Sequence, residues 1–240
     1  YKLQPLFSYA FKDRLSPHSD LSEINQFFSD LVESEDDFMD QLDGKERGII
    51  PSFRKVDPQF IVYKEVRYHH ILENLLDRDK SLKVVGIIRN PLSVTDSWLK
   101  APKEFRADLG WKVDEEWRFA PKKNLSKPEE FNGYEKWKEV ALLFSELKAL
   151  FPDCFYLIQY SELIENPLQQ IEDLFKFCDL NFPGSTRAFI QKSTSNSVSD
   201  AYGVYRNRQV DSKWKNSLNQ GIVSYIKQDL KGTDLEKYLN

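Results

Sequence analysis

The chain has 240 residues, a length that one globular α/β core can reach, so we expect a single domain over residues 1–240. Hydrophobic residues make up 40% and charged residues 30%, the balance of a folded soluble protein and not of a disordered chain. The formal net charge of −4 argues against general nucleic-acid binding, because a phosphate backbone requires a broad basic face. No apolar run approaches the roughly 20 residues that cross a bilayer, so we expect no membrane segment in this chain and a cytoplasmic location.

The first part of the chain contains two helical patterns around a short strand pattern. Apolar residues at helical spacing among acidic residues predict a surface helix over 21–39. The β-branched and aromatic run over 60–63 predicts a strand, and helical spacing follows it over 68–76. We therefore expect a helix, then a strand, then a helix.

The clearest strand and helix follow one another directly. The almost continuous apolar run over 83–88 is typical of a central parallel strand that is covered on both faces. Asn90 is a good N-cap and Pro91 a good first helical residue, so we expect a helix that runs to about Leu99. Arg89 lies at the junction between the strand and the helix.

The second half of the chain opens with an irregular segment and then repeats the alternation. Residues 101–132 contain prolines, glycines and tryptophans without a sustained period, which indicates a loop or lid. A helical pattern follows over 134–151, then a strand pattern over 154–158 and a helical pattern over 167–178. A last helix is expected over 222–230. Three strand–helix units indicate right-handed crossovers and a central parallel sheet, whose carboxyl edge is where ligands bind.

Cysteine and histidine are sparse. Cys154 and Cys178 are too few for a disulfide framework, and both lie in apolar runs, which favours buried thiols. The three histidines, His18, His69 and His70, show no metal-ligand spacing, so we expect no metal site.

Arg89 and Ser97 form the strongest candidate site. A helix N-terminus offers free N–H groups and the positive end of the helix dipole, and an arginine beside it adds a planar fork of N–H donors that grips two phosphate oxygens. Ser97 lies two turns later and adds a hydroxyl donor. The alternative is that Arg89 pairs with a nearby carboxylate and that Ser97 only fills a helix face.

Four segments, in order, resemble one family. Lys83-Val-Val-Gly-Ile-Ile-Arg-Asn-Pro-Leu-Ser-Val-Thr-Asp-Ser97 resembles the segment of sulfotransferases that binds the 3′-phosphate of the donor, in which a strand ends in Arg-(Asn/Asp)-Pro and a serine follows the arginine by eight positions. Residues 62–76 are similar to the lysine-containing strand and helix of that family. Residues 155–168 are similar to its Tyr-Glu-Asp-Leu turn with the Asp-Pro helix start, and residues 206–215 are similar to its basic loop.

The resemblance implies a fold and a reaction. The fold is α/β, a three-layer arrangement like that of P-loop NTPases, with a central parallel sheet flanked by helices. The reaction moves a sulfuryl group from 3′-phosphoadenosine 5′-phosphosulfate (PAPS) to a hydroxyl or amine acceptor, leaves 3′-phosphoadenosine 5′-phosphate (PAP), and needs no metal. The pattern is closest to carbohydrate sulfotransferases, so the expected partners are the nucleotide donor and a carbohydrate or small-molecule acceptor. The family's 5′-phosphosulfate loop has no counterpart here, and we expect it upstream of Tyr1.

The resemblance also assigns roles to residues that bind the donor. Arg89 and Ser97 match the ligands of the 3′-phosphate. Tyr160, at the end of the third strand, suits stacking on adenine or donation to a phosphate, and an ordinary core tyrosine is the alternative. Arg206 and Arg208 match mobile clamps on the 3′-phosphate, and a solvated surface patch is the alternative.

The catalytic residues are expected near the end of the first strand. Lys64 matches the family's lysine that contacts the transferring group. The position of the family's histidine base is Val66 here, which leaves Glu65, His69 and His70 as candidate bases, with Glu65 first. A structural role is the alternative for each of them.

Two other functions compete with a sulfotransferase. One is another nucleotide-dependent transferase, such as a phosphoryl transferase, with the same strand–arginine–helix geometry, although no acidic pair follows an apolar strand in a magnesium-binding pattern. The other is a non-catalytic nucleotide-binding module that keeps the 3′-phosphate site.

Overall fold

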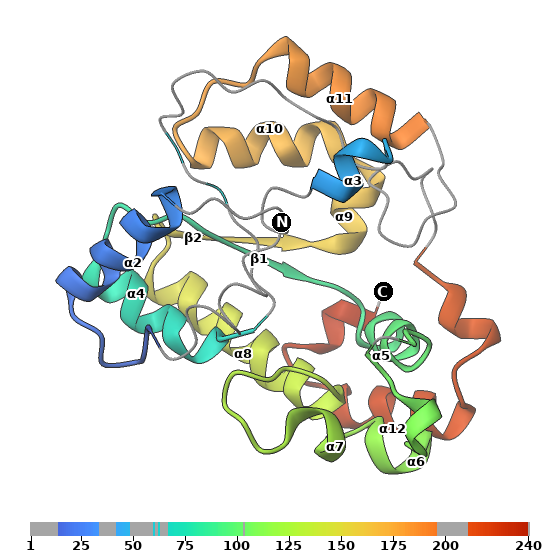
Figure 1. The fold of residues 1–240 in the computed structure, drawn as a ribbon. Coiled ribbons are helices and arrows are strands. Elements are labelled where there is room, and N and C mark those ends of the chain that lie inside the picture. Colours follow the sequence, from blue (N-terminus) through green and yellow to red (C-terminus); the bar gives the residue numbers. More distant parts are fainter. Residues whose placement is uncertain are drawn as a thin grey trace. The chain divides into compact units, whose positions relative to one another are not determined.

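The structure is a computed structural model, drawn in Figure 1. It describes residues 14–33, 42–48, 60, 62, 67–102, 104–195 and 211–239. These residues belong to two compact units, one of Tyr1–Leu82 with Ala188–Asn207 and the other of Lys83–Arg187 with Arg208–Asn240. The expected single domain stays a prediction, because compact units occur within domains as well as between them.

The first unit is helical where it is described. Its elements are α2 (Leu21–Glu33), α3 (Leu42–Glu46), η2 (His69–Ile71) and α4 (Leu72–Arg78). Helix α2 begins with a capping box, since the Asp20 and Glu23 side chains each accept a hydrogen bond from the other residue's backbone N–H, both at 2.9 Å. Apolar side chains of α2, of the η2–α4 segment and of the residues that precede each of them form one buried core: Leu15, Ile24, Phe27, Leu31, Tyr68, Ile71 and Leu75.

These elements confirm part of the sequence predictions for the first unit. The helix predicted over 21–39 is present over 21–33, and the rest lies outside the described residues. The helix predicted over 68–76 is present as η2 followed by α4. Most of the strand predicted over 60–63 is not described, so it stays a prediction.

The second unit contains the sheet. Strand β1 (Val84–Ile88) pairs in parallel with β2 (Phe155–Gln159), and Ile88 stands opposite Gln159. Two of the three predicted parallel strands are therefore confirmed. The other elements of this unit are α5 (Pro91–Leu99), η3 (Ala107–Leu109), α6 (Val113–Glu116), α7 (Pro121–Asn124), α8 (Tyr134–Leu150), α9 (Tyr160–Glu165), α10 (Pro167–Phe177), η4 (Lys213–Asn216), α12 (Gln220–Leu230) and η5 (Glu236–Leu239).

Helices cover both faces of the two strands, with α8 on one side and α10 on the other (Figure 1). Successive side chains of a strand point to opposite faces. Phe155 meets Phe144 of α8, with ring centroids 5.4 Å apart, and the next residue, Tyr156, meets Phe177 of α10 at 5.1 Å. Gly86 of β1 gives the α8 side room, because a Cβ atom there would lie 2.8 Å from both Phe144 and Phe155. The predicted parallel sheet flanked by helices is confirmed.

Three local predictions need correction. The pair Asn166-Pro167 predicts an N-cap and a first helical residue for α10, but the Asn166 side chain makes no capping hydrogen bond. The apolar residues at helical spacing predict a buried face for that helix, but all four are only half-buried: Leu168, Ile171, Phe175 and Cys178. The polar residues from Gln191 to Asp200 predict a flexible segment, but helix α11 (Gly184–Ser195) extends over 191–195. In α11 the hydroxyls of Ser193, Thr194 and Ser195 donate to carbonyls of the preceding turn, so these polar side chains find their acceptors within the helix.

The segment 101–132 is irregular, as its sequence indicates. It contains only the short elements η3, α6 and α7, separated by turns, and no strand among its described residues. Ala120, Leu125 and Ser126 have positive φ angles of 48°, 50° and 56°, which stop α7 at both ends. Whether the segment acts as a lid stays a prediction.

Candidate functional site at the sheet edge

The carboxyl ends of β1 and β2 bring two predicted site residues together. Because Ile88 is opposite Gln159, the next residues, Arg89 and Tyr160, leave the sheet side by side. The guanidinium carbon of Arg89 lies 5.0 Å from the centroid of the Tyr160 ring. This is within the range of a cation–π contact, so the tyrosine face fixes one face of the guanidinium group.

The helix that follows Arg89 begins as predicted. The Asn90 side-chain oxygen accepts from the backbone N–H of Leu92 at 2.9 Å, and Pro91 occupies the first helical position. The Asn90 amide also donates to the carbonyl oxygen of Leu239 at 2.9 Å. The N-terminus of α5, with its partial positive charge, is therefore fixed beside Arg89.

The backbone of Arg89 has a further support. The indole Nε1 of Trp137, on α8, donates to the Arg89 carbonyl oxygen at 3.0 Å. Trp137 is itself held between two aromatic rings, since it stacks on Tyr134 at 6.1 Å and meets the ring of Tyr238 edge-on at 6.3 Å. The strand end is thus attached to α8 by a hydrogen bond as well as by packing.

The guanidinium group of Arg89 forms an ion pair with the carboxylate of Asp211. Its Nη2 lies 2.6 Å from Oδ1 of Asp211, and its Nε lies 3.0 Å from Oδ1 and 3.2 Å from Oδ2. The side chain of Asp211 is only 12% exposed, and that of Arg89 is 35% exposed. The structure therefore has an ion pair at this position, which was the structural alternative for Arg89, and the donor role of Arg89 stays a prediction.

Asp211 and the residues after it run along α5. The Ser93 hydroxyl donates to the backbone carbonyl of Asp211 at 3.2 Å, and the Ser217 hydroxyl donates to Asp96 at 2.8 Å. Ser97, the second predicted phosphate ligand, is exposed on the same helix. It lies one turn beyond Ser93, and residues four apart share a helix face.

The remaining predicted residues lie in other segments of the chain. His69 is half-buried in η2 of the first unit. Lys64, Glu65, Arg206 and Arg208 lie outside the described residues. Their roles stay predictions.

The sequence did not indicate three residues that contact Arg89 or its partner: Trp137, Asp211 and Ser93. Trp137 lies in the helical pattern predicted over 134–151, and that pattern does not indicate an acceptor for its indole N–H. Asp211 is 122 residues away from Arg89, a separation at which no local pattern reports a contact.

A second charged cluster joins α8 to α12. The Tyr134 hydroxyl donates to Asp229 at 2.6 Å, and the Lys138 ammonium lies 2.8 Å from the same carboxylate oxygen. The pKa of Asp229 is lowered by these two hydrogen bonds, and the one from Lys138 has the larger effect. The pKa of Tyr134 is raised well above its usual value, chiefly by burial and next by its hydrogen bond to the Asp229 carboxylate. The hydroxyl therefore stays protonated and serves as a donor that fixes the two helices.

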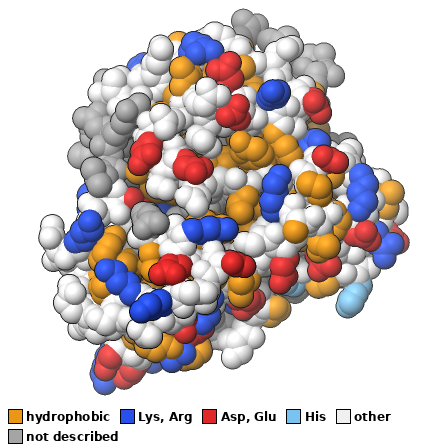
Figure 2. All heavy atoms as spheres, turned by 180° about the vertical axis from the view of Figure 1, so that it is seen from behind, with side chains coloured by type: hydrophobic (Ala, Val, Ile, Leu, Met, Phe, Trp, Pro, Cys, Tyr) orange, Lys and Arg blue, Asp and Glu red, His pale blue; other side chains and the backbone are white. Residues whose placement is uncertain are grey.

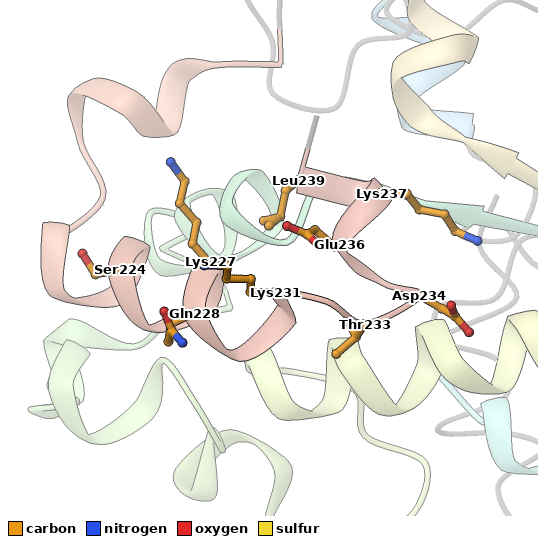
Figure 3. Close-up of a pocket in the computed structure, with 9 residues that line it drawn as sticks. All are labelled: Ser224, Lys227, Gln228, Lys231, Thr233, Asp234, Glu236, Lys237 and Leu239. Carbon is orange, nitrogen blue, oxygen red and sulfur yellow. The ribbon is translucent and has the colours of Figure 1, made fainter.

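A hollow of about 850 Å³ lies at the end of α12 (Figure 3). Its lining carries both signs of charge, with Lys227, Lys231 and Lys237 beside Asp234 and Glu236. In Figure 3 Lys227 and Lys237 extend away from one another, so they do not converge on one anion. None of the predicted site residues is among the described residues that line this hollow, and the sheet edge remains the candidate site.

Charges elsewhere are mixed as well. Acidic and basic side chains are interspersed over the face of the molecule drawn in Figure 2. Within the described ranges, no three His, Cys, Asp or Glu side chains gather closely enough to hold a metal ion. Among the helices of those ranges, none has the length and apolar character that crossing a membrane requires.

Comparison with known proteins identifies a family. Residues 58–238, more than half of the chain, match the family model described as the sulfotransferase domain. A crystal structure of mouse sulfotransferase SULT7A1 complexed with PAP is similar over 72% of this chain and 67% of the mouse chain, with 17% sequence identity and a TM-score of 0.47. A comparison with curated protein sequences found no match. The family match confirms the predicted family and its P-loop-like α/β fold class.

Proposed function

Because this chain belongs to the sulfotransferase family and is an enzyme of that family, we propose that it transfers a sulfuryl group from PAPS to a hydroxyl or amine acceptor. Arg89 and Ser97 bind the 3′-phosphate of the donor, and Tyr160 contacts the nucleotide beside them. Arg206 and Arg208 add positive charge to the same phosphate. The acceptor is a carbohydrate.

One observation carries the donor assignment. The guanidinium group of Arg89, at the carboxyl edge of two parallel strands, already holds an anionic group through two of its nitrogens. A phosphate presents oxygen atoms in the same bidentate geometry as a carboxylate. The N-terminus of α5 and the face of Tyr160 adjoin this position, so the residues present suit a nucleotide phosphate next to an aromatic ring.

The chemistry requires few protein groups. The donor supplies an activated sulfuryl group, whose bond to the 5′-phosphate breaks as the acceptor oxygen or nitrogen bonds to sulfur. The protein has to hold the reactants in line, remove the acceptor proton and balance charge on the departing phosphate. We assign the charge balance to Lys64 and the proton to Glu65 or His69. These three assignments rest on their positions in the sequence.

The segment 101–132 is proposed to recognise the acceptor. It exposes large apolar side chains, with Leu109 62%, Phe119 58% and Leu125 64% exposed. Trp111 and Trp117 of the same segment are partly exposed. Aromatic faces suit the apolar faces of sugar rings, and loops at the edge of a parallel sheet commonly select the ligand. A screen of carbohydrate, phenol and amine acceptors with labelled PAPS tests this class, and transfer to phenols alone contradicts it.

The donor assignment is tested by binding of two nucleotides, PAP and adenosine 5′-phosphate, which lacks the 3′-phosphate. Arg89→Ala should weaken PAP binding by about tenfold to a hundredfold, since a charge-assisted bidentate contact is worth about 1.5–3 kcal/mol. Arg89→Lys should recover part of the loss, because an ammonium group lacks the fork geometry. Ser97→Ala should cost about 1 kcal/mol, or about fivefold. Calorimetric titration measures each affinity.

Adenosine 5′-phosphate provides the internal control, because neither substitution removes a partner from it. Both variants should bind it as the parent does. Arg187→Ala is the matched arginine control, since Arg187 also pairs with an acidic residue, Glu172, through a single contact at 3.3 Å on the surface. If Arg89→Ala weakens both nucleotides equally, Arg89 supports the fold or another phosphate, and the donor assignment is wrong.

A further inference from the structure

Asp211 occupies the edge of the Arg89 guanidinium group that suits bidentate binding. Its Oδ1 accepts from both Nε and Nη2, at 3.0 and 2.6 Å, so these two donors are already engaged. One face of the same group lies on Tyr160. A phosphate that needs the Nε and Nη2 donors has to replace the carboxylate.

The backbone of Asp211 holds the carboxylate at this place. Its carbonyl accepts from Ser93, a buried residue in the first turns of α5. Ser97 lies one turn further along the same face of that helix. Asp211 thus contacts both Arg89 and the helix that carries Ser97, the two residues to which the proposed function assigns the 3′-phosphate.

A carboxylate and a phosphate cannot share this position without cost. Asp211 is largely shielded from water, at 12% exposure, so its charge is poorly screened. A half-buried arginine without any anion is costly too, because its donors lose water without gaining a partner. The arrangement therefore favours one anion at a time on Arg89.

We propose, on the basis of the proposed function, that Asp211 is an internal counter-ion that exchanges with the donor's 3′-phosphate on Arg89. The nucleotide binds by displacing the carboxylate, and the carboxylate returns to Arg89 when PAP leaves. Asp211 thereby sets the affinity for nucleotides with a 3′-phosphate and leaves the affinity for other nucleotides unchanged. The exchange replaces hydrogen bonds and an ion pair, and no covalent bond is formed or broken.

Asp211→Asn tests the exchange, because the amide keeps the shape of the side chain and loses its charge. We expect PAP to bind about tenfold more tightly, or about 1.4 kcal/mol, and to dissociate more slowly. Adenosine 5′-phosphate should bind within about twofold of its parent affinity. Calorimetry gives the affinities and stopped-flow displacement gives the dissociation rates. Asp211→Ser is a second uncharged variant, expected to act in the same direction if the asparagine variant folds poorly.

Glu172→Gln is the matched control, since it neutralises an acidic residue in the exposed pair with Arg187 and should not change PAP binding. Weaker PAP binding by Asp211→Asn, with adenosine 5′-phosphate unchanged, would show that Asp211 positions Arg89 and would overturn the exchange. Equal affinities in the variant and the parent would overturn it as well. Failure of the proposed function is separate, because it appears as an equal loss of both nucleotides in Arg89→Ala.

Discussion

Two arginine–aspartate pairs of the second unit use the same two guanidinium nitrogens, Nε and Nη2, and have different origins. Arg106 holds Asp108 through Nε and Nη2, two residues away, in the segment 101–132. Arg89 holds Asp211 across 122 residues, at the end of β1. The side chains of the first pair are 42% and 59% exposed, and those of the second are 35% and 12% exposed. The first pair forms within one turn of the chain, whereas the second forms only when residues far apart in the sequence fold together.

The surroundings of the two pairs differ in the same way. Beside Arg89, helix α5 is buried along most of its first turns, including Pro91 and Leu92. Beside Arg106, residues 107–110 are all exposed. The strand end is held by long-range contacts to Trp137 of α8, to Asp211 and to Leu239 of η5, which fix its direction. The segment 101–132 is built mainly from short-range turns, which leave its surface open to a ligand.

The largest effect that separates the two regions should come from burial. Leu92→Ala removes a fully buried side chain of α5 and should destabilise the protein by about 2–5 kcal/mol, because it loses transfer free energy and leaves a cavity. Leu109→Ala removes the same atoms from an exposed site and should change stability by less than about 0.5 kcal/mol. Urea unfolding followed by circular dichroism measures both. Similar losses in the two variants would show that the segment is packed as tightly as α5.

The strand end was predictable because its signals are local. A run of apolar residues ends at Ile88, and an N-cap and a proline follow at once, so the strand, the turn and the helix each have their own signature. The predicted boundary at Leu99 is the observed end of α5. The meeting of Arg89 with Tyr160 was predictable too, because parallel strands end at one edge.

The partners of Arg89 were not predictable in this way. An acidic residue such as Asp211 follows no period and no motif, and many carboxylates of the chain were equally available. The hydrogen bond from Trp137 depends on how α8 lies across the sheet. Helices α6 and α7 escaped prediction for another reason. Each has only four residues, and the left-handed residues Ala120 and Leu125 flank α7, so no helical period develops.

An intermediate effect is expected at the charged cluster that links the segment 101–132 to α8 and α12. Arg118 donates to Glu135 at 2.7 Å, and Lys138 bridges Glu135 and Asp229 at 3.1 and 2.8 Å. Asp229→Asn removes the charge at the end of this network and should lower the free energy of unfolding by about 1.5 kcal/mol at pH 7. Thermal unfolding of the parent and the variant over a pH series measures it.

The stability difference between the parent and Asp229→Asn should change with pH in one direction only. The pKa of Asp229 is lowered in the folded protein, chiefly by the Lys138 and Tyr134 hydrogen bonds, relative to about 3.9 in an unfolded chain. A lowered pKa stabilises the fold above the unfolded value, and this contribution is lost as the pH falls through the folded value. The difference between parent and variant should therefore be full at neutral pH and shrink below about pH 4. A constant difference down to pH 2 would assign the loss to packing.

The smallest effect should come from the exposed pair. Arg106 lowers the pKa of Asp108, chiefly through the side-chain hydrogen bond, so the two groups do interact in the folded protein. Arg106 and Asp108 are only two residues apart, however, so an unfolded chain can form much of the same contact. A contact that is present in both states does not change the free energy of unfolding. Asp108→Asn should therefore leave the thermal unfolding temperature unchanged within error, at low and at high salt. Asp211→Asn should lower that temperature in the absence of nucleotide, because its long-range contact exists only in the folded state. An equal fall in both variants would mean that the exposed pair also depends on the fold, and the distinction between a local pair and a fold-dependent pair would be lost.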